Sequence, residues 1–460
     1  MYQINFEKPC HIHFIGIGGI SMSGLAQILL EEGFCVSGSD AKESPLTDHL
    51  ADQGAKIRYP QAADNIPDDT DVIVYTAAIH PDNPEYAAAV SRNIPMLTRA
   101  ELLGQLMLNY KTSINIAGTH GKTTTTSMVT EVLLAADLDP TVSVGGILPT
   151  IGGNIRVGKS GLFVTEACEY TNSFLSFHPT VEVILNVEAD HLDFFKDLDD
   201  IRSSFAAFIR LLPSDGLLII NGDIKDVSEL TAHASCPVIT VGHAAFCDYQ
   251  AADITYDALA HPTFRVIHKT EGDLGLFSLN VPGEHNVYNA LATIALGRSL
   301  LIPTESIRAG LLRFTGTKRR FEKKGELKGV TIIDDYAHHP QEIAVTLKAA
   351  KKCPFNKVWC VFQPHTYTRT KAFLDEFAQS LSLADEVILA RIYPARETDT
   401  LGISSDDIRL RLEALGTPVH YLETFDEIEN FILENCVPND LLITMGAGDV
   451  VTIGESLLNL

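Results

Sequence analysis

The sequence predicts an α/β protein built from three domains. Three times along the chain, a short apolar strand is followed by a loop rich in glycine or histidine and then by a longer helical pattern, which is typical of parallel α/β units. A length of 460 residues agrees with three domains, since a domain has roughly 150 residues. Hydrophobic residues make up 45% of the chain and charged residues 20%, so it has enough apolar surface for sizeable cores.

The first domain is expected over residues 1–111 and is expected to be Rossmann-like. It opens with a strand, a glycine turn, a helix and a second strand, which are predicted at residues 11–17, 18–19, 22–30 and 34–39. A parallel sheet with helices on both faces follows from this order of elements.

The glycine turn of this first unit points to a diphosphate. Gly16, Gly18 and Gly19 let the backbone come close to a pyrophosphate, and the positive end of the following helix favours its charge. Asp40, after the second strand, completes most of a dinucleotide fingerprint, whose sixth position is Ser21 instead of glycine. The motif alone does not choose between NAD and another nucleoside diphosphate, so an NAD-dependent dehydrogenase is one alternative.

The loop after the strand predicted at residues 72–75 is expected to line the same crevice. It contains Ala78-Ile79-His80 and then Asn83-Pro84-Glu85. For each of these residues the alternative interpretation is a polar loop that only closes a strand–helix unit.

The second domain, expected over residues 112–321, opens with a phosphate loop. A strand at 113–117 leads into Gly118-Thr119-His120-Gly121-Lys122 and a threonine-rich helix that runs to residue 136. Backbone N–H groups and the helix end converge there and Lys122 adds a full charge, which suits a nucleoside triphosphate such as ATP. Thr123 and Thr124 continue the ATP-binding loop, and the Thr123 hydroxyl can bind the Mg²⁺ that bridges the terminal phosphates. The alternative is a helix-capping turn with a solvated lysine.

A polar, basic stretch at residues 316–328 leads into the third domain, which is expected over residues 322–460. The stretch contains Arg319 and Arg320, which are assigned no individual role and for which the alternative interpretation is a solvated linker. A strand predicted at 330–333 begins a further series of alternating strands and helices, so a second Rossmann-like domain is expected.

Charge and cysteine content exclude several classes of protein. Lys and Arg total 35 against 59 Asp and Glu, and the net charge of -24 disfavours nonspecific binding to nucleic acid or to an anionic membrane. The eight cysteines form no CxxC pair and no zinc spacing, which favours reduced thiols. With neither a leader pattern nor a run of about 18 apolar residues, a cytoplasmic protein without membrane insertion is expected.

Further ordered motifs lie in the middle and third domains. In the middle domain these segments are residues 118–124, Glu166-Ala-Cys-Glu169, Asn186-Val-Glu-Ala-Asp190-His191, and Pro282-Gly-Glu-His285-Asn286 with Asn289. In the third domain they are Asp334-Asp-Tyr336-Ala-His338-His339-Pro, Gln363-Pro-His365-Thr-Tyr367-Thr-Arg369-Thr, Tyr393-Pro-Ala-Arg396-Glu397 and Met445-Gly-Ala-Gly-Asp449. These ordered segments resemble the Mur ligases, ATP-dependent amide-forming enzymes of peptidoglycan synthesis. The third-domain segments are similar to the branch of the family that adds the first amino acid.

The resemblance implies a reaction and its substrates. The lactyl carboxylate of UDP-N-acetylmuramate would attack the γ-phosphate of ATP to give an acyl phosphate, and the amino group of L-alanine would then displace phosphate. ADP and phosphate would be released, with Mg²⁺ as the metal. The resemblance assigns the diphosphate of the UDP-sugar to the first domain, where the expected binding residues are Gly16, Gly18, Gly19, Ser21, Asp40 and His80.

The resemblance also implies roles for residues of the central domain. Lys122 and His191 are the expected catalytic residues, with Lys122 stabilising charge on the transferred phosphoryl group. Thr123, Glu169 and His191 are the expected metal site, and hard Mg²⁺ prefers the oxygen atoms of the first two.

Two further groups of residues are implied nearer the C-terminus. Asn289 is expected to read the adenine edge, and Asp334 to contact the nucleotide from the third domain. Tyr336, His365 and Arg369 are the expected amino-acid site. A guanidinium matches a carboxylate in a bidentate way, so Arg369 is the expected clamp for the L-alanine carboxylate.

Three alternatives remain open from the sequence. A relative that recycles murein peptides onto UDP-N-acetylmuramate shares the ATP and sugar machinery. An NAD-dependent dehydrogenase explains the first domain but leaves Lys122 and Glu169 without a function. A non-catalytic nucleotide-binding protein needs no amino-acid site. The chain is expected to be a monomer or a homodimer.

Overall fold

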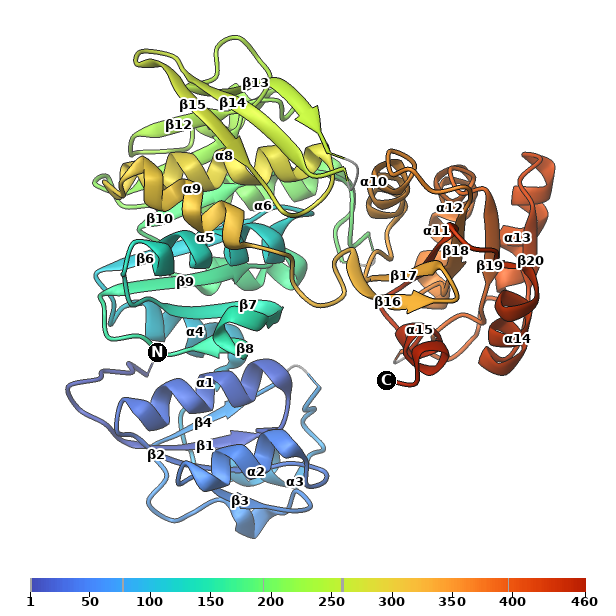
Figure 1. Ribbon diagram of the computed structural model, residues 1–460. Coiled ribbons are helices and arrows are strands. Elements are labelled where there is room, and N and C mark those ends of the chain that lie inside the picture. Colours follow the sequence, from blue (N-terminus) through green and yellow to red (C-terminus); the bar gives the residue numbers. More distant parts are fainter. Residues whose placement is uncertain (1, 77, 193, 258–259, 396) are drawn as a thin grey trace. The chain divides into compact units, whose positions relative to one another are not determined.

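The computed structural model describes residues 2–76, 78–192, 194–257, 260–395 and 397–460 (Figure 1). The chain divides into two compact units, one made of Met1–Thr126 with Leu133–Val241 and the other of Ser127–Val132 with Gly242–Leu460. Parallel sheets with helices packed on them confirm the predicted α/β fold. The boundaries of the three predicted domains stay a prediction.

The first sheet lies in the N-terminal part of the first unit. Its strands are all parallel and follow the order β3-β2-β1-β4-β5. The order reverses between β1 and β4, and open α/β sheets bind ligands at the carboxyl ends of such a pair. The elements are β1 His11–Ile15, α1 Ile20–Glu31, β2 Cys35–Ser39, α2 Pro45–Asp52, β3 Lys56–Arg58, η1 Ala63–Asn65, β4 Val72–Tyr75, α3 Pro84–Ser91, β5 Met96–Thr98 and α4 Arg99–Met107.

The remaining strands of the first unit follow the order β12-β11-β10-β6-β9-β7-β8. Neighbours are parallel except for the antiparallel pair β7 and β8. Strands such as β11 are nearly continuous apolar runs, as expected when both faces of a parallel sheet are covered. The elements are β6 Thr112–Ala117, α5 Lys122–Ala135, β7 Thr141–Leu148, η2 Pro149–Ile151, β8 Gly153–Arg156, β9 Leu162–Ala167, η3 Tyr170–Ser176, β10 Val181–Ile184, α6 Leu198–Ile209, β11 Leu217–Asn221, α7 Val227–Thr231 and β12 Val238–Val241.

The second unit begins with three antiparallel strands and two helices. Strand β14 pairs with β13 on one side and with β15 on the other. The elements are β13 Tyr249–Tyr256, β14 Pro262–His268, β15 Gly272–Ser278, α8 Glu284–Ser299 and α9 Thr304–Arg313.

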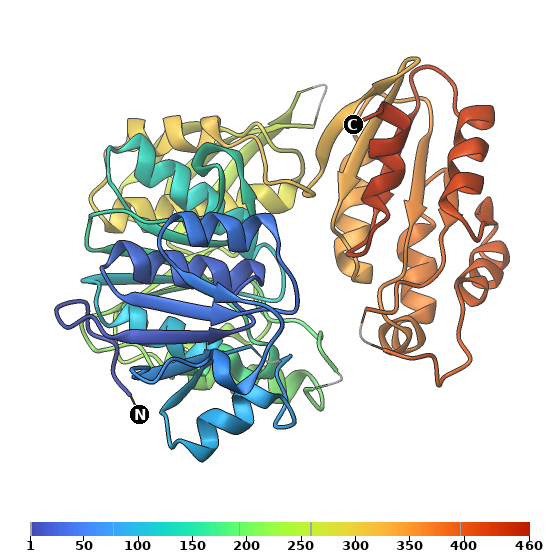
Figure 2. The same cartoon turned by 90° about the horizontal axis from the view of Figure 1, so that it is seen from below.

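A six-stranded sheet completes the second unit, in the order β16-β17-β21-β18-β19-β20. Its side chains alternate between two cores, because Ile333 and Phe362 belong to one and their neighbours Ile332 and Val361 to the other. Figure 2 shows helices on both faces of this sheet. The elements are β16 Glu322–Leu327, β17 Val330–Asp335, α10 Pro340–Ala350, β18 Val358–Phe362, α11 Tyr367–Ala372, α12 Leu374–Leu381, β19 Glu386–Leu389, α13 Ser405–Ala414, β20 Val419–Tyr421, α14 Phe425–Asn435, β21 Leu441–Met445 and α15 Val451–Leu458.

The first strand and helix differ slightly from the sequence prediction. Strand β1 ends at Ile15 rather than at residue 17, because the N–H groups of Gly16 and Ile17 both bond to the Ser39 carbonyl, at 2.9 and 3.0 Å. Helix α1 therefore starts at Ile20, two residues earlier than predicted. The turn is thus shifted by two residues toward the N-terminus, and the helix starts directly after Gly19.

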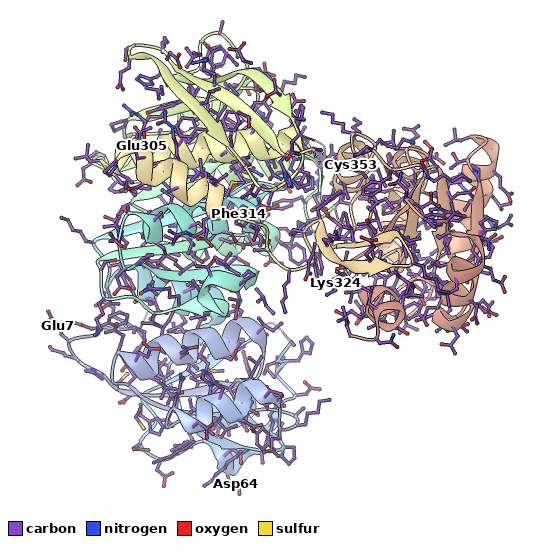
Figure 3. The ribbon with its side chains drawn as sticks, viewed as in Figure 1. Glu7, Asp64, Glu305, Phe314, Lys324 and Cys353 are labelled. Carbon is purple, nitrogen blue, oxygen red and sulfur yellow. The ribbon has the colours of Figure 1, made fainter. Side chains whose placement is uncertain are left out.

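The basic stretch at residues 316–328 is in part a strand of the third sheet. It contains β16, which pairs antiparallel with β17. Lys324 of β16, labelled in Figure 3, pairs with Glu455 of α15, with 2.9 Å between Nζ and Oε1. The linker interpretation of Arg319 is wrong, since its Nε lies 2.9 Å from the Asp334 carboxylate. Sequence reasoning missed both partners because they are distant along the chain.

No helix within the described residues has both the length and the apolar character needed to cross a membrane. All eight cysteines, each within the described ranges, are free thiols, as the sequence predicts. Burial raises the pKa of several of them, including the Cys436 thiol, whose pKa rises to about 12.

A carboxyl group lies in the core of the first unit. Glu182 of β10 is fully buried, and neither of its carboxyl oxygens has a hydrogen-bond partner among the described residues. Burial raises its pKa well above the usual value. Its neighbour across the strands is Asn115 of β6, whose Oδ1 also lacks a partner. A protonated carboxyl has a hydrogen to donate to such an acceptor, so the neutral acid fits this position.

Glu182→Gln is expected to stabilise the protein increasingly as the pH rises. Because the folded pKa of Glu182 is raised, its contribution to stability is complete below the unfolded pKa and is lost as the pH rises toward the folded pKa. The glutamine does not titrate. The melting temperature of the variant should exceed that of the wild type by about 2 to 4 °C at pH 8, which corresponds to roughly 1 kcal/mol, and by less at pH 5. Exposed Glu43→Gln serves as the control. A difference in melting temperature that is the same at every pH would show that Glu182 ionises in the folded protein as readily as in the unfolded chain.

Candidate active site

The phosphate loop joins β6 to α5 and is shaped by glycine. Gly118 has a φ angle of +141°, which favours glycine, and a Cβ atom there would lie 3.1 Å from the Cβ of Leu185 and 3.2 Å from the backbone nitrogen of Asn186. The loop can therefore close tightly against the segment that follows β10 only without a side chain at this position.

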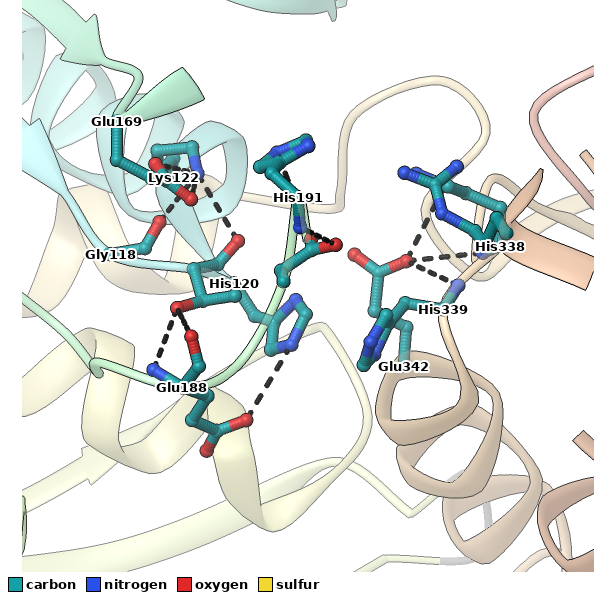
Figure 4. A network of polar contacts seen from close by, with 12 residues as sticks. Gly118, His120, Lys122, Glu169, Glu188, His191, His338, His339 and Glu342 are labelled. Atoms are coloured by element: carbon teal, nitrogen blue, oxygen red, sulfur yellow. Dashed lines mark hydrogen bonds and ion pairs between the residues drawn. The ribbon is translucent and has the colours of Figure 1, made fainter. Parts of the chain in front are cut away.

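Lys122, the first residue of α5, turns back over the loop. Its Nζ donates to the carbonyl oxygens of Gly118 and Thr119, and it lies 3.0 Å from Oε2 of Glu169 (Figure 4). Burial alone would lower the pKa of Lys122, but the Glu169 carboxylate outweighs this effect and the pKa is raised. The Glu169 side chain is only 2% exposed. The structure thus brings together the predicted catalytic lysine and a predicted metal ligand.

The segment after β10 braces the phosphate loop. The Asn186 side chain accepts the N–H of His120 at 2.8 Å and donates to the His120 carbonyl at 3.0 Å. The Glu188 N–H donates to Thr119 Oγ1 at 3.0 Å, and the Glu188 carboxylate lies 3.6 Å from His120 Nε2 (Figure 4). These contacts fix Thr119 and His120, so the backbone N–H groups of the loop are held in one orientation.

His191 is held beside the segment that carries Glu169. Its backbone has a φ angle of +51°, and its N–H donates to the side chain of Asp190 at 2.7 Å. The imidazole ring lies 4.5 Å from the ring of Tyr170, which follows Glu169 directly. Thr123 and Thr124 lie in the first turn of α5 and are half-buried. No three His, Cys, Asp or Glu side chains of the described ranges form a ready metal cluster.

The glycine loop of the first domain is closed by Asp40. The Gly18 N–H donates to the Asp40 carboxylate at 2.7 Å, and a Cβ atom on Gly18 would come within 2.9 Å of the same oxygen. Helix α1 begins after Gly19 with neither a side-chain cap nor an acidic residue in its first turn. This leaves a helix start suited to an anion, and binding of a diphosphate there stays a prediction. His80 is exposed on the loop after β4.

Glu85 does not line this site as the sequence suggested. It is fully buried, and its carboxylate accepts from Ser39 Oγ at 2.6 Å and lies 3.2 Å from His13 Nε2. Its other oxygen accepts from Asn65 Nδ2 at 2.8 Å and from the Ala62 N–H at 3.0 Å. Although burial alone would raise the pKa of Glu85, these hydrogen bonds outweigh it and the pKa is lowered. The residue anchors α3 to the sheet.

In the second unit the three predicted amino-acid-binding residues lie in one cluster. The rings of Tyr336 and His338 are 5.4 Å apart, and those of His338 and His365 are 5.9 Å apart. Arg369 continues the chain of contacts, with its Nη1 at 3.4 Å from His365 Nδ1. Burial lowers the pKa of His338, which favours the neutral imidazole. Tyr336, His365 and Arg369 are thus brought together through His338, to which the sequence assigned no role.

A cavity of about 710 Å³ opens at the carboxyl edge of the six-stranded sheet. Tyr393 lines it, and the ring of Tyr393 also stacks on His365 at 5.6 Å, so the cavity adjoins the aromatic cluster. The motif residue Arg396 lies outside the described residues. The described lining residues are Gln363, Tyr367, Arg391, Ile392, Tyr393, Pro394, Asp399, Ile403, Ser404, Ser405, Tyr421, Thr424, Phe425 and Asp449.

Asn289 and Asp334, the two predicted nucleotide contacts of this unit, are buried. The Asn289 amide donates to Asn286 Oδ1 at 3.0 Å. The Asp334 carboxylate accepts from Arg319 Nε at 2.9 Å and from Thr444 Oγ1 at 2.7 Å. Burial raises the pKa of Asp334, and Arg319 only partly offsets this. Both carboxyl oxygens are engaged inside the domain, and contact of Asn289 or Asp334 with nucleotide stays a prediction.

Three family descriptions match successive parts of the chain. Residues 11–111 match "Mur ligase family, catalytic domain", residues 116–297 match "Mur ligase middle domain" and residues 319–448 match "Mur ligase, glutamate ligase domain". Among similar proteins, the UDP-N-acetylmuramate--L-alanine ligase of Lachnospira eligens is 60% identical, with 100% of both chains covered. The ligase of the same name from Agathobacter rectalis is 59% identical, again over 100% of both chains.

Solved structures give the same result. The UDP-N-acetylmuramate-alanine ligase of Thermotoga maritima is 32% identical and superposes with a TM-score of 0.81, with 98% of each chain covered. A murein peptide ligase from Psychrobacter arcticus is 26% identical with a TM-score of 0.72, also over 98% of each chain. Together with the family descriptions, which run from residue 11 to residue 448, these similarities show that the chain belongs to the Mur ligase family.

Proposed function

We propose that this protein joins L-alanine to the lactyl carboxylate of UDP-N-acetylmuramate and converts ATP to ADP and phosphate. The observation that carries the proposal is the 60% identity, over the full length of both chains, with a ligase named for these two substrates. The Lys122–Glu169 pair on a braced glycine loop supports an ATP site in the same chain.

The proposed reaction needs activation of a carboxylate. A carboxylate cannot acylate an amine at neutral pH because its leaving group would be oxide, whereas an acyl phosphate releases phosphate. Lys122 would stabilise the charge that spreads over the phosphoryl group during transfer. Its ammonium group is held within 3.1 Å of the Thr119 carbonyl and 3.0 Å of Glu169, so it is oriented before substrate binds.

Each proposed domain would then hold one substrate. Residues 1–111 would bind the UDP-sugar through the glycine loop and His80, residues 112–321 would bind ATP, and residues 322–460 would bind L-alanine through the cluster of Tyr336, His365 and Arg369. The reaction would take place in the cytoplasm.

The donor atoms near Lys122 suit Mg²⁺. Glu169 offers carboxylate oxygens and Thr123 a hydroxyl oxygen, and Mg²⁺ is commonly held by one or two carboxylates together with substrate phosphates. Bound there, Mg²⁺ would neutralise charge on the β- and γ-phosphate oxygens. His191 offers a nitrogen atom, which Mg²⁺ prefers less than oxygen. From its position beside Tyr170 it would contact the metal through a water molecule.

Glu169→Gln is expected to raise the Mg²⁺ concentration needed for half-maximal activity by about 10-fold or more. The change removes one hard anionic ligand and keeps the size of the side chain. Calorimetric titration of Mg²⁺ in the presence of a non-hydrolysable ATP analogue measures the loss directly. Exposed Glu43→Gln provides a control for charge. If the affinities for Mg²⁺ and for the nucleotide analogue were unchanged, Glu169 would not bind the metal and would serve only to pair with Lys122.

A second candidate is ligation of a murein peptide instead of L-alanine. The cavity of about 710 Å³ beside the His365–Tyr393 stack is far larger than the methyl side chain of alanine requires. A murein peptide ligase is also among the similar structures.

The test is phosphate release by the purified protein with ATP, Mg²⁺ and UDP-N-acetylmuramate. We expect release to depend on L-alanine and to be weak with glycine, because one methyl group is worth about 1 to 3 kcal/mol. Release that needs the peptide L-alanyl-γ-D-glutamyl-meso-diaminopimelate would favour the recycling reaction. Thermal stabilisation by NADH and not by UDP-N-acetylmuramate would support a dehydrogenase instead.

A further inference from the structure

Arg99, the first residue of α4, carries a charge without an anionic partner. Its Nη1 donates to Ser21 Oγ at 3.2 Å, and no carboxylate in the described part of the chain forms an ion pair with it. A guanidinium has five N–H donors, so one bond to a neutral hydroxyl leaves most of its capacity unused. By contrast, Arg92 of the same domain donates to two backbone carbonyls and lies 3.7 Å from Asp68.

The surroundings of Arg99 make an unpaired positive charge energetically unfavourable. The side chain is half-buried, and burial lowers its pKa. A partly desolvated cation is stabilised by an anion that accepts several of its N–H groups. A residue in this state is therefore suited to an anionic ligand.

Arg99 also lies at a place where other groups favour an anion. Ser21 stands in the first turn of α1, directly after the Gly16–Gly19 loop, and this helix start has neither an acidic residue nor a side-chain cap. Cys168, which lies near Arg99, precedes Glu169 in the sequence. Arg99 thus lies near both the glycine loop and the segment that carries Glu169.

We propose that Arg99 binds the diphosphate of the UDP-sugar. The inference rests on the proposed function and adds a substrate-binding residue outside the motifs found in the sequence. The planar guanidinium can contact two phosphate oxygens at once, while Ser21 holds it toward the glycine loop. Arg99 would in this way position the sugar end of the substrate relative to the segment that carries Glu169.

The test compares UDP with uridine, which share the nucleoside and differ in the diphosphate. Calorimetric titration should show that Arg99→Gln weakens UDP binding by about 10- to 100-fold, the loss of a charge-assisted hydrogen-bonding pair, and leaves uridine binding unchanged. Arg99→Lys, which keeps the charge, should bind UDP more tightly than Arg99→Gln. Arg92→Gln is the matched control and should bind UDP like the wild type.

Three outcomes would overturn the assignment. Equal UDP affinity in Arg99→Gln and the wild type would exclude a diphosphate contact. Unchanged UDP affinity with weakened UDP-N-acetylmuramate affinity would place the guanidinium on the lactyl carboxylate instead. A wild-type protein that bound neither UDP nor UDP-N-acetylmuramate would overturn the proposed function together with this assignment. Melting temperatures show whether each variant is folded, and the Lys variant keeps the comparison valid if the Gln variant is not.

Discussion

Lys122→Ala is expected to lower the kcat for phosphate release by at least about 10³-fold, the range found when a positioned cation is removed from a phosphoryl-transfer site. Lys122 is held over the loop by the carbonyl oxygens of Gly118 and Thr119 and by Glu169, so its charge has a fixed position. Steady-state phosphate release with ATP, UDP-N-acetylmuramate and L-alanine measures the effect.

The same change has a cost in stability that must be separated from the loss of catalysis. Without Lys122, the Glu169 carboxylate, only 2% exposed, loses the cation that pairs with it. Removing one partner of a buried pair costs about 3 to 5 kcal/mol, so the melting temperature of Lys122→Ala should fall. The double variant Lys122→Ala/Glu169→Gln removes the uncompensated charge and should recover much of that loss without recovering turnover.

UDP-sugar binding gives the control for this prediction. The glycine loop of the first domain contains neither residue, so both variants should bind UDP-N-acetylmuramate with nearly wild-type affinity. Near-normal phosphate release from Lys122→Ala would mean that this loop is not the ATP site. Loss of turnover together with loss of UDP-sugar binding would instead point to a folding defect.

The phosphate loop was predictable because its determinants are local. A strand, Gly118, Gly121 and Lys122 follow one another within a few residues, and the structure joins β6 to α5 there. Residues whose function depends on distant partners escaped prediction. Arg319 donates to the Gly446 carbonyl, 127 positions away, and Glu85 contacts His13, 72 positions away. No periodicity or spacing in the sequence carries such information.

In the candidate site, too, the contacts between residues that are distant along the chain could not be predicted from the sequence. Asn186 lay inside a segment that resembles the family, but its two hydrogen bonds to His120 became visible only when β10 and β6 were paired. His338 stood in a motif without a role until the fold placed it between Tyr336 and His365. Arg99 lay in no motif at all, and only its contact with Ser21 singled it out.

Arg369→Lys is expected to raise the KM for L-alanine by about 10- to 100-fold. The lysine keeps the positive charge but loses the planar fork that binds both oxygens of a carboxylate, and a hydrogen bond to a charged group is worth about 1.5 to 3 kcal/mol. In the structure Arg369 lies 3.4 Å from His365 Nδ1, and His365 in turn packs on His338 and Tyr393. The guanidinium is therefore held at the edge of the aromatic cluster, facing a neighbour that carries no negative charge of its own.

Steady-state kinetics with each substrate varied in turn separates the possible causes. The KM values for ATP and for UDP-N-acetylmuramate should stay within about twofold of the wild-type values, because Arg369 has no predicted contact with either. Lys371→Arg on the same short helix α11 is the matched control, since Lys371 is exposed and its replacement also keeps the positive charge. It should leave all three KM values unchanged. If Arg369→Lys raised all three KM values equally, the arginine would support the folding or closure of the domain rather than clamp the amino acid, since a clamp acts only on the substrate it holds.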